Sequence, residues 1–399
     1  MAKKHTQLDI FRHTEAGRSM LLSLQEAIDL TINSLNTYGS NLSAWVIGYS
    51  GGKDSTATAT LIDWLIATEQ IESPSSKILV FCNTLMELPF LLDSANRLLD
   101  HLQAKGWQIR RTEPQLETTI PKTERFFVTM LGKGYPPPHN RFRWCTNRLK
   151  AEKIDSICLA IRSEYGNDFL GIDGIRKGES IARDRIITTS CNKEDGECGQ
   201  GWFHKNQSGT GYKLSPLLHW RVCNVWDWLV EAKYEYGYPI DGVFETYGMG
   251  DYDPENDEPL NSRTGCIGCP LVTTANEEKP RIDKALETVI LQDRWTHLAP
   301  FTRLADIYWR LRWDESFRHR KKNGEKGCLT LAARQWALDA ILGLQAESTK
   351  LALEKGLTPY VLIQPEEVEL IQKMILDRTF PKASQYELGE LERSIEITS

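Results

Sequence analysis

Residues 49–56 are Tyr-Ser-Gly-Gly-Lys-Asp-Ser-Thr, placed between the apolar run 45–48 and a segment of helical periodicity. A strand that turns through two glycines, Gly51 and Gly52, into a helix start is typical of phosphate binding. The glycines let backbone N–H groups point inward, and the helix N-terminus adds partial positive charge. Hydroxyl donors and one positive charge complete the loop: Ser50, Ser55, Thr56 and Lys53. The adjacent glycines exclude the Walker spacing. An ordinary glycine-rich turn is the alternative.

Strands and helices alternate around this loop. Continuous apolar runs of strand length indicate strands buried on both faces. The pattern predicts an α/β fold with a doubly wound, mainly parallel sheet, whose ligands bind at the carboxyl ends of strands. Predicted strands are 44–49, 77–82, 107–112 and 168–172, and predicted helices are 17–40, the segment after residue 56, and 89–102.

The later part of the chain has a different character. Residues 132–140, with three consecutive prolines, predict a rigid loop. The polar stretches 191–213 and 248–264 predict loops, with a helix at 224–236 between them. After residue 279 the pattern is largely helical, and the aromatic residues of 295–313 are expected to form core. The predicted domains are an N-terminal helical segment (1–43), an α/β domain (44–280) and a helical C-terminal region (281–399).

Composition narrows the class of protein. The chain has 399 residues and a net charge of −6. Its beginning lacks the apolar segment of a signal peptide, and no run is long enough to span a membrane, so we expect a cytoplasmic location and no membrane partner. Nucleic acid would require a local basic patch. Two basic runs, 122–153 and 318–326, are candidates, and a solvated surface is the alternative for each.

Nine cysteines in a cytosolic chain predict metal binding, catalysis or burial instead of disulfides. Cys266 and Cys269 form a CxxC pair, a spacing shared by redox, zinc and iron–sulfur sites. Cys145 lies among arginines, a field expected to favour its thiolate. The other cysteines have simpler roles. Small apolar packing is expected for Cys82, Cys158 and Cys328, and a polar insert or a zinc loop for Cys191, Cys198 and His204.

The 50–55 stretch resembles the SGGxDS pyrophosphate loop (PP-loop) of ATP pyrophosphatases. These enzymes cleave ATP to AMP and pyrophosphate while adenylylating a second substrate. The resemblance implies ATP and Mg²⁺ as cofactors and places Asp54 in the functional set. Our hypothesis is that Asp54 orders the loop or contacts metal, the alternative being an N-terminal helix cap. Lys53 and Ser55 would stabilise the charge of the departing pyrophosphate.

Three further segments are similar to the DndC/SspD-type proteins of DNA phosphorothioation, which belong to the PAPS reductase-like PP-loop superfamily. The first is Gly-Lys-Gly-Tyr-Pro-Pro-Pro at 132–138, followed by Phe-Arg-Trp-Cys-Thr-Asn-Arg-Leu-Lys at 142–150. The second is Gly-Ile-Arg-Lys-Gly-Glu-Ser at 174–180 with Arg183, and the third is Arg-Thr-Gly-Cys-Ile-Gly-Cys at 263–269. The resemblance covers roughly residues 44–275. It implies an adenine nucleotide alpha hydrolase-like fold and sulfur insertion into the DNA backbone.

This resemblance also implies site residues. The catalytic set would be Lys53, Asp54 and Arg176, and Asn83 would lie at the adenosine position, where many relatives have Asp. Substrate phosphate would be bound by Arg143, Arg176, Glu179 and Arg183. A [4Fe–4S] cluster would be ligated by Cys145, Cys266 and Cys269, with Cys223 or Cys198 as fourth ligand or an open iron. Trp144 and Tyr135 would stack on a base or pack in the core.

Other functions compete with this one. A PAPS or APS reductase would use a C-terminal cysteine, and no cysteine follows Cys328. Thiolation of tRNA uses the same loop and a three-cysteine cluster. A catalytically inactive scaffold or nucleotide sensor is the alternative from another class. The expected partners of the DNA function are DNA, a cysteine desulfurase as sulfur donor, and a nicking or strand-opening protein.

Overall fold

The computed structural model describes residues 22–112, 121–191, 196–205, 211–247, 265–281, 283–321, 323–381 and 386–387. The chain divides into two compact units, each made of several segments. The first unit contains residues 1–82, 93–111 and 154–243, and the second contains 83–92, 112–153 and 244–399. The predicted domain boundaries at residues 44 and 281 remain a prediction.

The first unit is built on a seven-stranded sheet in the order β3-β2-β1-β4-β7-β6-β5. β1 pairs in parallel with β2 and with β4, and β4 pairs in parallel with β7. β5 and β6 are antiparallel additions at one edge. The strands are β1 (Ala44–Tyr49), β2 (Ser76–Cys82), β3 (Gln108–Thr112), β4 (Phe169–Ile172), β5 (Gly196–Glu197), β6 (Trp202–Lys205) and β7 (Tyr212–Ser215). The mainly parallel sheet is confirmed.

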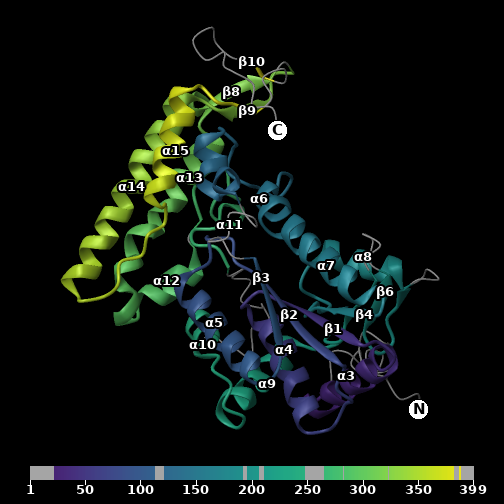
Figure 1. The fold of residues 1–399 in the computed structure, drawn as a ribbon. Helices are drawn as coiled ribbons and strands as arrows, with labels where there is room; N and C mark the ends of the chain where they lie inside the picture. Colours follow the sequence, from purple (N-terminus) through teal and green to yellow (C-terminus); the bar gives the residue numbers. More distant parts are fainter. Residues whose placement is uncertain are drawn as a thin grey trace, which may run out of the picture. The chain divides into compact units, whose positions relative to one another are not determined.

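Helices cover both faces of this sheet (Figure 1). Alternate residues of β1 and β2, such as Val46 and Val80, pack against Ile161 of α7 (Glu152–Tyr165). On the other face, α4 (Lys53–Ala67) packs against β1 and α9 (Val222–Tyr234), and the Trp45 indole donates to the carbonyl of Gly39 in α3 (Leu24–Gly39). The doubly wound arrangement is therefore confirmed. α3 begins at Leu24, because Ser23 caps it, and residues 17–21 of the predicted helix lie outside the described part. The remaining helices of this region are α5 (Pro89–Ala104), α8 (Ile181–Ser190) and α10 (Asp241–Tyr247).

The strand order creates a switch point in the middle of the sheet. The chain moves from β1 to β2 on one side, while β4 lies on the other side of β1. Loops that leave the carboxyl ends of β1 and β4 therefore diverge, which is where open α/β sheets bind ligands. The loop after β1 is residues 50–52, and the loop after β4 is residues 173–180.

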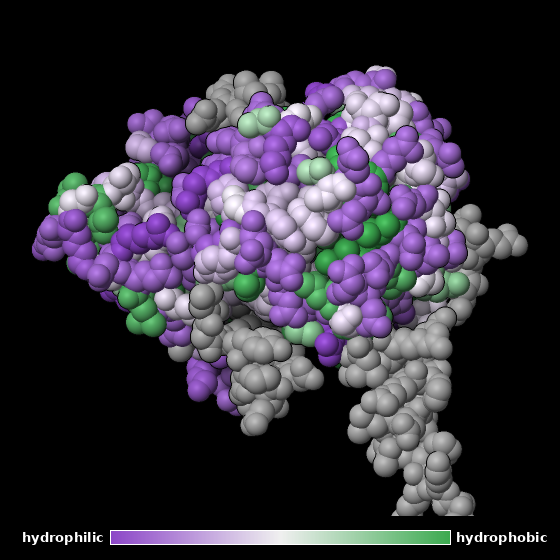
Figure 2. Space-filling model, turned by 90° about the horizontal axis from the view of Figure 1, so that it is seen from below, coloured by the Kyte–Doolittle hydropathy of each residue, from purple (hydrophilic) through white to green (hydrophobic). Residues whose placement is uncertain are grey.

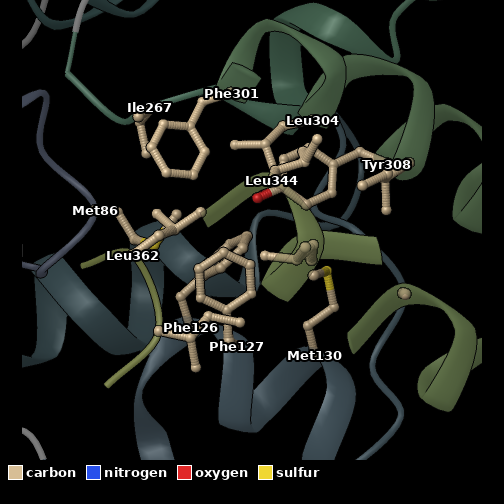
Figure 3. Close-up of a cluster of buried hydrophobic side chains, with 14 of the residues drawn as sticks. Met86, Phe126, Phe127, Met130, Ile267, Phe301, Leu304, Tyr308, Leu344 and Leu362 are labelled. Carbon is tan, nitrogen blue, oxygen red and sulfur yellow. The ribbon is translucent and has the colours of Figure 1, made fainter. Parts of the chain in front are cut away.

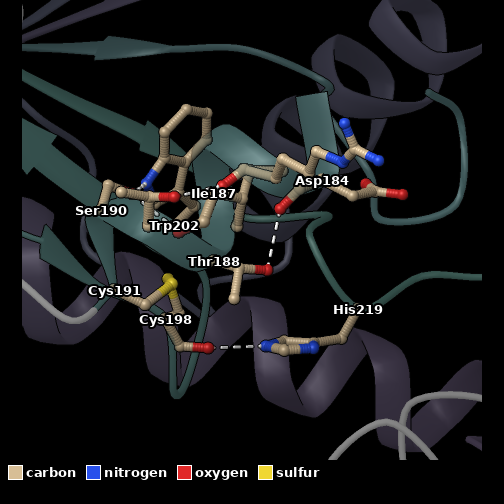
Figure 4. The surroundings of a disulfide bond; sticks show 10 residues. Asp184, Ile187, Thr188, Ser190, Cys191, Cys198, Trp202 and His219 are labelled. Carbon is tan, nitrogen blue, oxygen red and sulfur yellow. Dashed lines mark hydrogen bonds between the residues drawn. A yellow bond between two sulfur atoms is a disulfide. The ribbon is translucent and has the colours of Figure 1, made fainter. Parts of the chain in front are cut away.

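Two predictions for the polar segment 191–213 are wrong. Residues 202–205 and 212–215 are strands instead of loop, because the buried Trp202 anchors β6 on Ile187 and Leu218. Cys191 and Cys198 form a disulfide, which excludes both the zinc loop and the expectation of no disulfide. The Cα atoms of Cys191, at the end of α8, and Cys198, just after β5, lie 5.6 Å apart; Figure 4 shows the disulfide. Nε2 of His219 lies 2.9 Å from the Cys198 carbonyl oxygen and supports this turn.

The second unit has a core of helices with a three-stranded sheet at its edge. Figure 3 shows part of this core, in which Phe126, Phe301 and Leu362 come from distant segments. Phe301 and Tyr308 are fully buried, so the aromatic stretch 295–313 contributes to the core as predicted. The helices are α6 (Trp144–Thr146), α11 (Pro270–Thr273), α12 (Lys284–Ile290), α13 (Leu304–Trp313), α14 (Leu331–Glu354) and α15 (Pro365–Leu376). The 3₁₀ segments are η1 (Lys122–Glu124), η4 (Asp293–Arg303) and η5 (Glu315–Phe317), and the π-helical turns are η2 (Val128–Gly132) and η3 (Asn147–Ala151).

The sheet of the second unit has the order β10-β8-β9, formed by β8 (Arg318–Lys321), β9 (Lys326–Leu329) and β10 (Tyr386–Glu387). The second basic run is therefore a β-hairpin. Arg334, fully buried at the start of α14, donates to the carbonyls of Leu131, Gly132 and Thr379. This guanidinium joins the end of η2, the start of α14 and the segment after α15.

The surface seen in Figure 2 is mostly hydrophilic and carries small groups of hydrophobic residues. Within the described ranges, none of the helices has the length and apolar character needed to cross a bilayer. The predicted turn-rich segment 248–264 lies outside the described residues.

Candidate functional site

The PP-loop wraps around the start of its own helix. Gly51 has a φ of +76°, a conformation that favours glycine, and Gly52 is the extended residue before α4. The Ser55 hydroxyl donates to the Gly52 carbonyl at 3.0 Å and accepts from the backbone N–H of Ser50 at 3.2 Å. The hydroxyls of Ser50 and Ser55 lie 3.0 Å apart. Thr56 is fully buried in α4. The loop is thus held in place by internal hydrogen bonds.

A chain of alternating charges runs from this loop to the loop after β4. Lys53 Nζ lies 2.8 Å from one Asp54 carboxylate oxygen, and Arg176 Nε lies 2.7 Å from the other. Arg176 also donates to Glu179 at 3.3 Å, and Arg183 donates to the second oxygen of Glu179 at 2.7 Å. Five residues predicted from sequence motifs are therefore brought together at the switch point. Asp54 pairs with Lys53 and Arg176 and lies after the N-cap position, which Gly52 occupies, so it is not the helix cap; its hypothesised role in ordering the loop or contacting metal stays a prediction.

The two carboxylates in this chain differ in charge environment. Burial would raise the pKa of Asp54, but Arg176 and Lys53 outweigh burial and hold that pKa below its usual range. Burial and the negative charge of Asp54 raise the pKa of Glu179, despite its contacts with Arg176 and Arg183. Asp54 is therefore the fixed anion of the network, and Glu179 is the group that protonates more readily.

The two arginines also differ. Arg176 is 5% exposed, and its remaining contact is a donation to the Trp220 carbonyl at 3.4 Å, so it acts as a scaffold for Asp54 and Glu179. The Arg183 side chain is 43% exposed and can reach a ligand. Contact of either with substrate phosphate stays a prediction. Gly174 permits the close packing, since a Cβ there would lie 2.8 Å from both the Asp54 carbonyl and the Thr58 hydroxyl.

Asn83 follows β2 directly and belongs to the second unit. Its side-chain oxygen accepts from the backbone N–H of Leu85 at 2.9 Å and closes a turn in which Leu85 has a φ of +64°. The backbone N–H of Asn83 donates to the Thr112 hydroxyl at 3.2 Å. Asn83 thus shapes this turn, and its contact with adenosine stays a prediction.

The CxxC pair is fixed by backbone pairing. Ile267 N–H donates to the Met86 carbonyl at 2.7 Å, and Leu88 N–H donates to the Gly265 carbonyl at 3.0 Å, on either side of a bridge between Glu87 and Cys266. The Gly268 N–H donates to Asp283 at 2.8 Å. Cys145 lies in α6 and is partly buried, as are Cys266 and Cys269.

The three thiols belong to one neighbourhood. Burial raises the pKa of Cys266 most, Lys150 opposes that rise, and Glu87, Cys269 and Cys145 add to it. Burial likewise raises the pKa of Cys269, and Cys145 adds to this rise. The expectation of a thiolate at Cys145 is wrong for the protein alone, because burial raises the pKa of this thiol more than its hydrogen bonds and Lys150 lower it. A bound cation or cluster would favour deprotonation of these thiols.

No three His, Cys, Asp or Glu side chains in the described segments are arranged to hold a metal ion. A [4Fe–4S] cluster attaches each cysteine to a different iron, so its ligands need not converge on one point. Cys198 is removed as fourth ligand by its disulfide. Cys223 belongs to α9 of the first unit, and its role as fourth ligand stays a prediction. Cys82 and Cys328 are buried as expected, whereas Cys158 is half-buried.

Aromatic residues near Cys145 divide between core and surface. Trp144 is 4% exposed, stacks on Phe126 and donates to the Pro136 carbonyl at 3.0 Å, so core packing is the correct alternative for it. Tyr135 is half-buried and stacks parallel to the exposed ring of Phe142. Arg148 donates to the Tyr135 hydroxyl at 3.0 Å.

The two basic runs meet in the second unit. The Leu329 N–H at the end of β9 donates to the carbonyl of Gly134 at 2.8 Å, which fixes the proline-rich loop beside the hairpin. Burial lowers the pKa of His139 in that loop, and positive charge from Arg312, Arg318 and Arg141 lowers it further. Positive side chains far apart in sequence therefore act on the same imidazole. Arg143, predicted to bind phosphate, is exposed in the same loop and donates to Asn140 at 3.0 Å.

Sequence reasoning missed three residues around the cysteines. Glu87 is buried and accepts from both the backbone N–H and the hydroxyl of Thr84 at 2.8 Å. Asp283 fixes the CxxC turn and caps α12, a role that an Asp before a helical segment could have signalled. Tyr308 is fully buried and carries a hydroxyl that its aromatic pattern does not reveal.

A family model described as the phosphoadenosine phosphosulfate reductase domain matches residues 44–248. Two uncharacterized proteins of Methanocaldococcus jannaschii are similar, with 23% identity over 227 residues and 25% over 244 residues. The matches cover 57% and 61% of this chain but 41% and 40% of those relatives. The chain therefore spans less than half the length of either relative.

Several solved structures show a distant likeness. FMN adenylyltransferase of Candida glabrata, in complex with FMN and an ATP analog, has a TM-score of 0.33 at 15% identity, covering 56% of this chain and 65% of its own. The U34-tRNA thiolase NcsA of Methanococcus maripaludis, with its [4Fe–4S] cluster, has a TM-score of 0.32 at 15% identity, with coverages of 56% and 72%. NMN synthetase of Francisella tularensis has a TM-score of 0.32 at 15% identity, with coverages of 68% and 93%. No functional conclusion follows from likenesses this low.

Proposed function

Because the chain belongs to the phosphoadenosine phosphosulfate reductase domain family, we propose that it is an ATP pyrophosphatase that inserts sulfur into the DNA backbone. A non-bridging phosphate oxygen of DNA attacks the α-phosphorus of ATP, and the bond to pyrophosphate breaks. Sulfide then forms a bond to the DNA phosphorus while the bond to the adenylylated oxygen breaks. AMP leaves with that oxygen, and a phosphorothioate remains.

The charge chain in the first unit supports the ATP half of this proposal. The hydroxyls of Ser50 and Ser55 and the loop N–H groups supply donors for pyrophosphate. Lys53 exchanges part of its contact with Asp54 for a phosphate oxygen. Arg176 stays buried and holds Asp54 in place, so the loop needs little reorganisation when ATP binds. Mg²⁺, when bound with ATP, would neutralise phosphate charge, with Asp54 the nearest carboxylate to receive it.

The cysteine group carries the sulfur half of the proposal. Three thiols from two distant segments gather in apolar surroundings, and thiolates are the usual ligands of iron–sulfur clusters. The donor set therefore fits a [4Fe–4S] cluster held by Cys145, Cys266 and Cys269, which would supply an iron able to carry sulfide. Lys150 adds positive charge beside Cys266 and would favour the thiolate state on loading. A cysteine desulfurase would supply the sulfur as a persulfide, and a two-electron thiol reductant would release it as sulfide.

Exposed arginines of the proline-rich loop support a polyanionic substrate. Arg141 and Arg143 are exposed in the proline-rich loop, and the exposed Phe142 ring lies between them in sequence. Exposed cations beside an aromatic ring suit a single strand, because the backbone meets the charges while a base stacks on the ring. A nicking or strand-opening partner would provide such a strand. In this proposal the enzyme acts in the cytoplasm, where DNA and ATP are available.

Mass spectrometry of nuclease-digested DNA and tRNA tests the proposal. Cells carrying the intact gene system would be compared with cells carrying Cys145→Ser or Asp54→Ala. We expect phosphorothioate-linked dinucleotides in the first and none in either variant. Loss of a tRNA thionucleoside with unchanged DNA sulfur would contradict the proposal and assign the PP-loop to base thiolation. Cys158→Ser, at a half-buried cysteine outside the proposed site, is the matched control and should leave DNA sulfur unchanged.

A further inference from the structure

Tyr308 has a buried hydroxyl that lacks a hydrogen-bond partner in the described part of the chain. The residue is fully buried in α13, and its neighbours in the core are apolar. Figure 3 shows the Tyr308 side chain directed into the middle of this hydrophobic core. A buried hydroxyl without a partner destabilises the folded state relative to a paired one. Phenylalanine would fill the same space without that cost. The presence of a tyrosine therefore indicates that a bound group accepts a hydrogen bond from its hydroxyl.

The geometry of α13 indicates where this ligand lies. Residues 304, 308 and 312 share one face of the helix, since they are spaced by four. At one end of this face, the Cβ of Leu304 lies 2.9 Å from the position a Cβ would take at Gly268, inside the CxxC turn. At the other end, Arg312 donates to the carbonyl and to the hydroxyl of Thr274 at 3.0 Å. Tyr308 therefore faces the segment that contains Cys269.

The electrostatics agree with this placement. Burial raises the pKa of Tyr308 well above its usual range, and Cys269 and Cys266 add to the rise. A tyrosine in this environment remains protonated at any working pH. The Tyr308 hydroxyl is then available as a hydrogen-bond donor in the neighbourhood of Cys266 and Cys269, and it is not a candidate acid or base.

We propose that the Tyr308 hydroxyl donates a hydrogen bond to a sulfur atom of the cluster held by Cys145, Cys266 and Cys269. The inference rests on the proposed function for the presence of that cluster. Tyr308 is a positioning residue in this role. A donor to cluster sulfur stabilises the reduced state, which carries more negative charge, and so raises the reduction potential.

The test compares Tyr308→Phe with the unaltered full chain before and after anaerobic cluster reconstitution. In the cluster-free form, we expect unfolding by urea to show equal or greater stability for the variant, since the substitution removes an unpaired polar group. In the loaded form, we expect similar iron and sulfide content but a more negative reduction potential in an EPR-monitored titration. Tyr238→Phe is the matched control, because the Tyr238 hydroxyl donates to Asp63 at 2.6 Å in the first unit. This control should lose stability in both forms and keep the potential.

The outcomes separate the inference from the proposed function. A loaded Tyr308→Phe protein with an unchanged potential overturns the inference and leaves the proposed function standing. A clear loss of stability in the cluster-free variant shows that the hydroxyl already has a partner and also overturns it. Failure of the unaltered chain to take up iron and sulfide removes the cluster from the proposed function, and the inference falls with it.

Discussion

The charge chain of the first unit and the cysteine group of the second differ in how far the protein itself stabilises the charged forms of their side chains. In the first, Lys53, Asp54 and Arg176 already pair at 2.7–2.8 Å, and Asp54 keeps a low pKa. In the second, burial raises the pKa of all three thiols, and the neighbouring Tyr308 hydroxyl lacks a partner among the described residues.

This difference indicates two kinds of ligand. A loop whose charges are balanced in advance suits a ligand that comes and goes, since each phosphate oxygen replaces an existing contact at little cost. A group of partly buried thiols with raised pKa values suits a ligand that stays, because burial disfavours the thiolates until a positively charged ligand compensates their charge. ATP fits the first description, and a resident cluster fits the second.

The largest expected effect is on the cysteine group. Cys269→Ala should remove nearly all iron and sulfide from the reconstituted protein, because a cluster bound by three protein thiols loses one ligand. Iron and sulfide analysis with the visible absorption spectrum measures this. Cys328→Ala, at a fully buried cysteine in β9, is the matched control and should retain the cluster. Equal cluster content in both variants would show that Cys269 is not a ligand.

The next effect would break the charge chain. Arg176→Met leaves Asp54 and Glu179 as partly buried carboxylates that lack their central partner, a change that costs at most about 3–5 kcal/mol of unfolding free energy. Arg183→Met removes a half-exposed ion pair and should cost less than about 1 kcal/mol. Urea unfolding of the two variants measures the contrast. Similar losses of unfolding free energy in the two variants would show that the buried Arg176 contributes no more to stability than the half-exposed Arg183.

A smaller effect is expected from Gly174→Ala. The added Cβ would meet the Asp54 carbonyl and the Thr58 hydroxyl at 2.8 Å, so the two loops of the switch point must separate. We expect a loss of about 1–3 kcal/mol in stability, typical of overpacking, together with weaker ATP binding in calorimetry. Gly166→Ala is the control for a glycine substitution outside the site. A Cβ at Gly166 meets no atom within 4 Å, although the φ of +65° at this residue adds backbone strain. Unchanged ATP affinity in Gly174→Ala would show that the close packing at Gly174 does not affect ATP binding by the PP-loop.

The smallest effect concerns pH. The lowered pKa of Asp54 means that its stabilising contribution is present at neutral pH and is lost as pH falls through the folded-state pKa, below about 3.9. The raised pKa of Glu179 has the opposite sign: as pH falls, folded Glu179 takes up its proton before the unfolded chain does, so the folded state gains stability relative to the unfolded state. Stability of Asp54→Asn should therefore fall less steeply in acid than that of the unaltered chain. Parallel curves would contradict this assignment.

The parts of the fold that sequence could predict are those with strong local signals. The apolar runs of β1, β2 and β4 and the glycine turn at 51–52 each carry their own pattern, so the parallel sheet and the PP-loop are confirmed. The short strands β6 and β7 escaped prediction because polar residues surround them, and only the burial of Trp202 shows their place in the sheet. The polar residues around β6 and β7 thus gave no sign that these strands pair with the rest of the sheet.

The contacts among the candidate site residues were not predictable from the sequence. Asp54 and Arg176 were both candidates, but they are 122 residues apart, and no local pattern signals their 2.7 Å contact. The aromatic pattern correctly placed Tyr308 in the core, and for that reason it concealed the hydroxyl. The arginines around Cys145 suggested a thiolate, yet Arg143 and Arg148 bind Asn140 and Tyr135 while burial controls the thiol.

Arg334 has a consequence for the order of events during synthesis. Its guanidinium joins carbonyls at residues 131, 132 and 379, so three segments that leave the ribosome far apart in time must meet before the second unit can close. Such non-local closure is slow and comes late. Cys145 and the CxxC pair are therefore made well before the core that buries them is complete. During this interval the thiols are more accessible than in the complete unit, where they are partly buried.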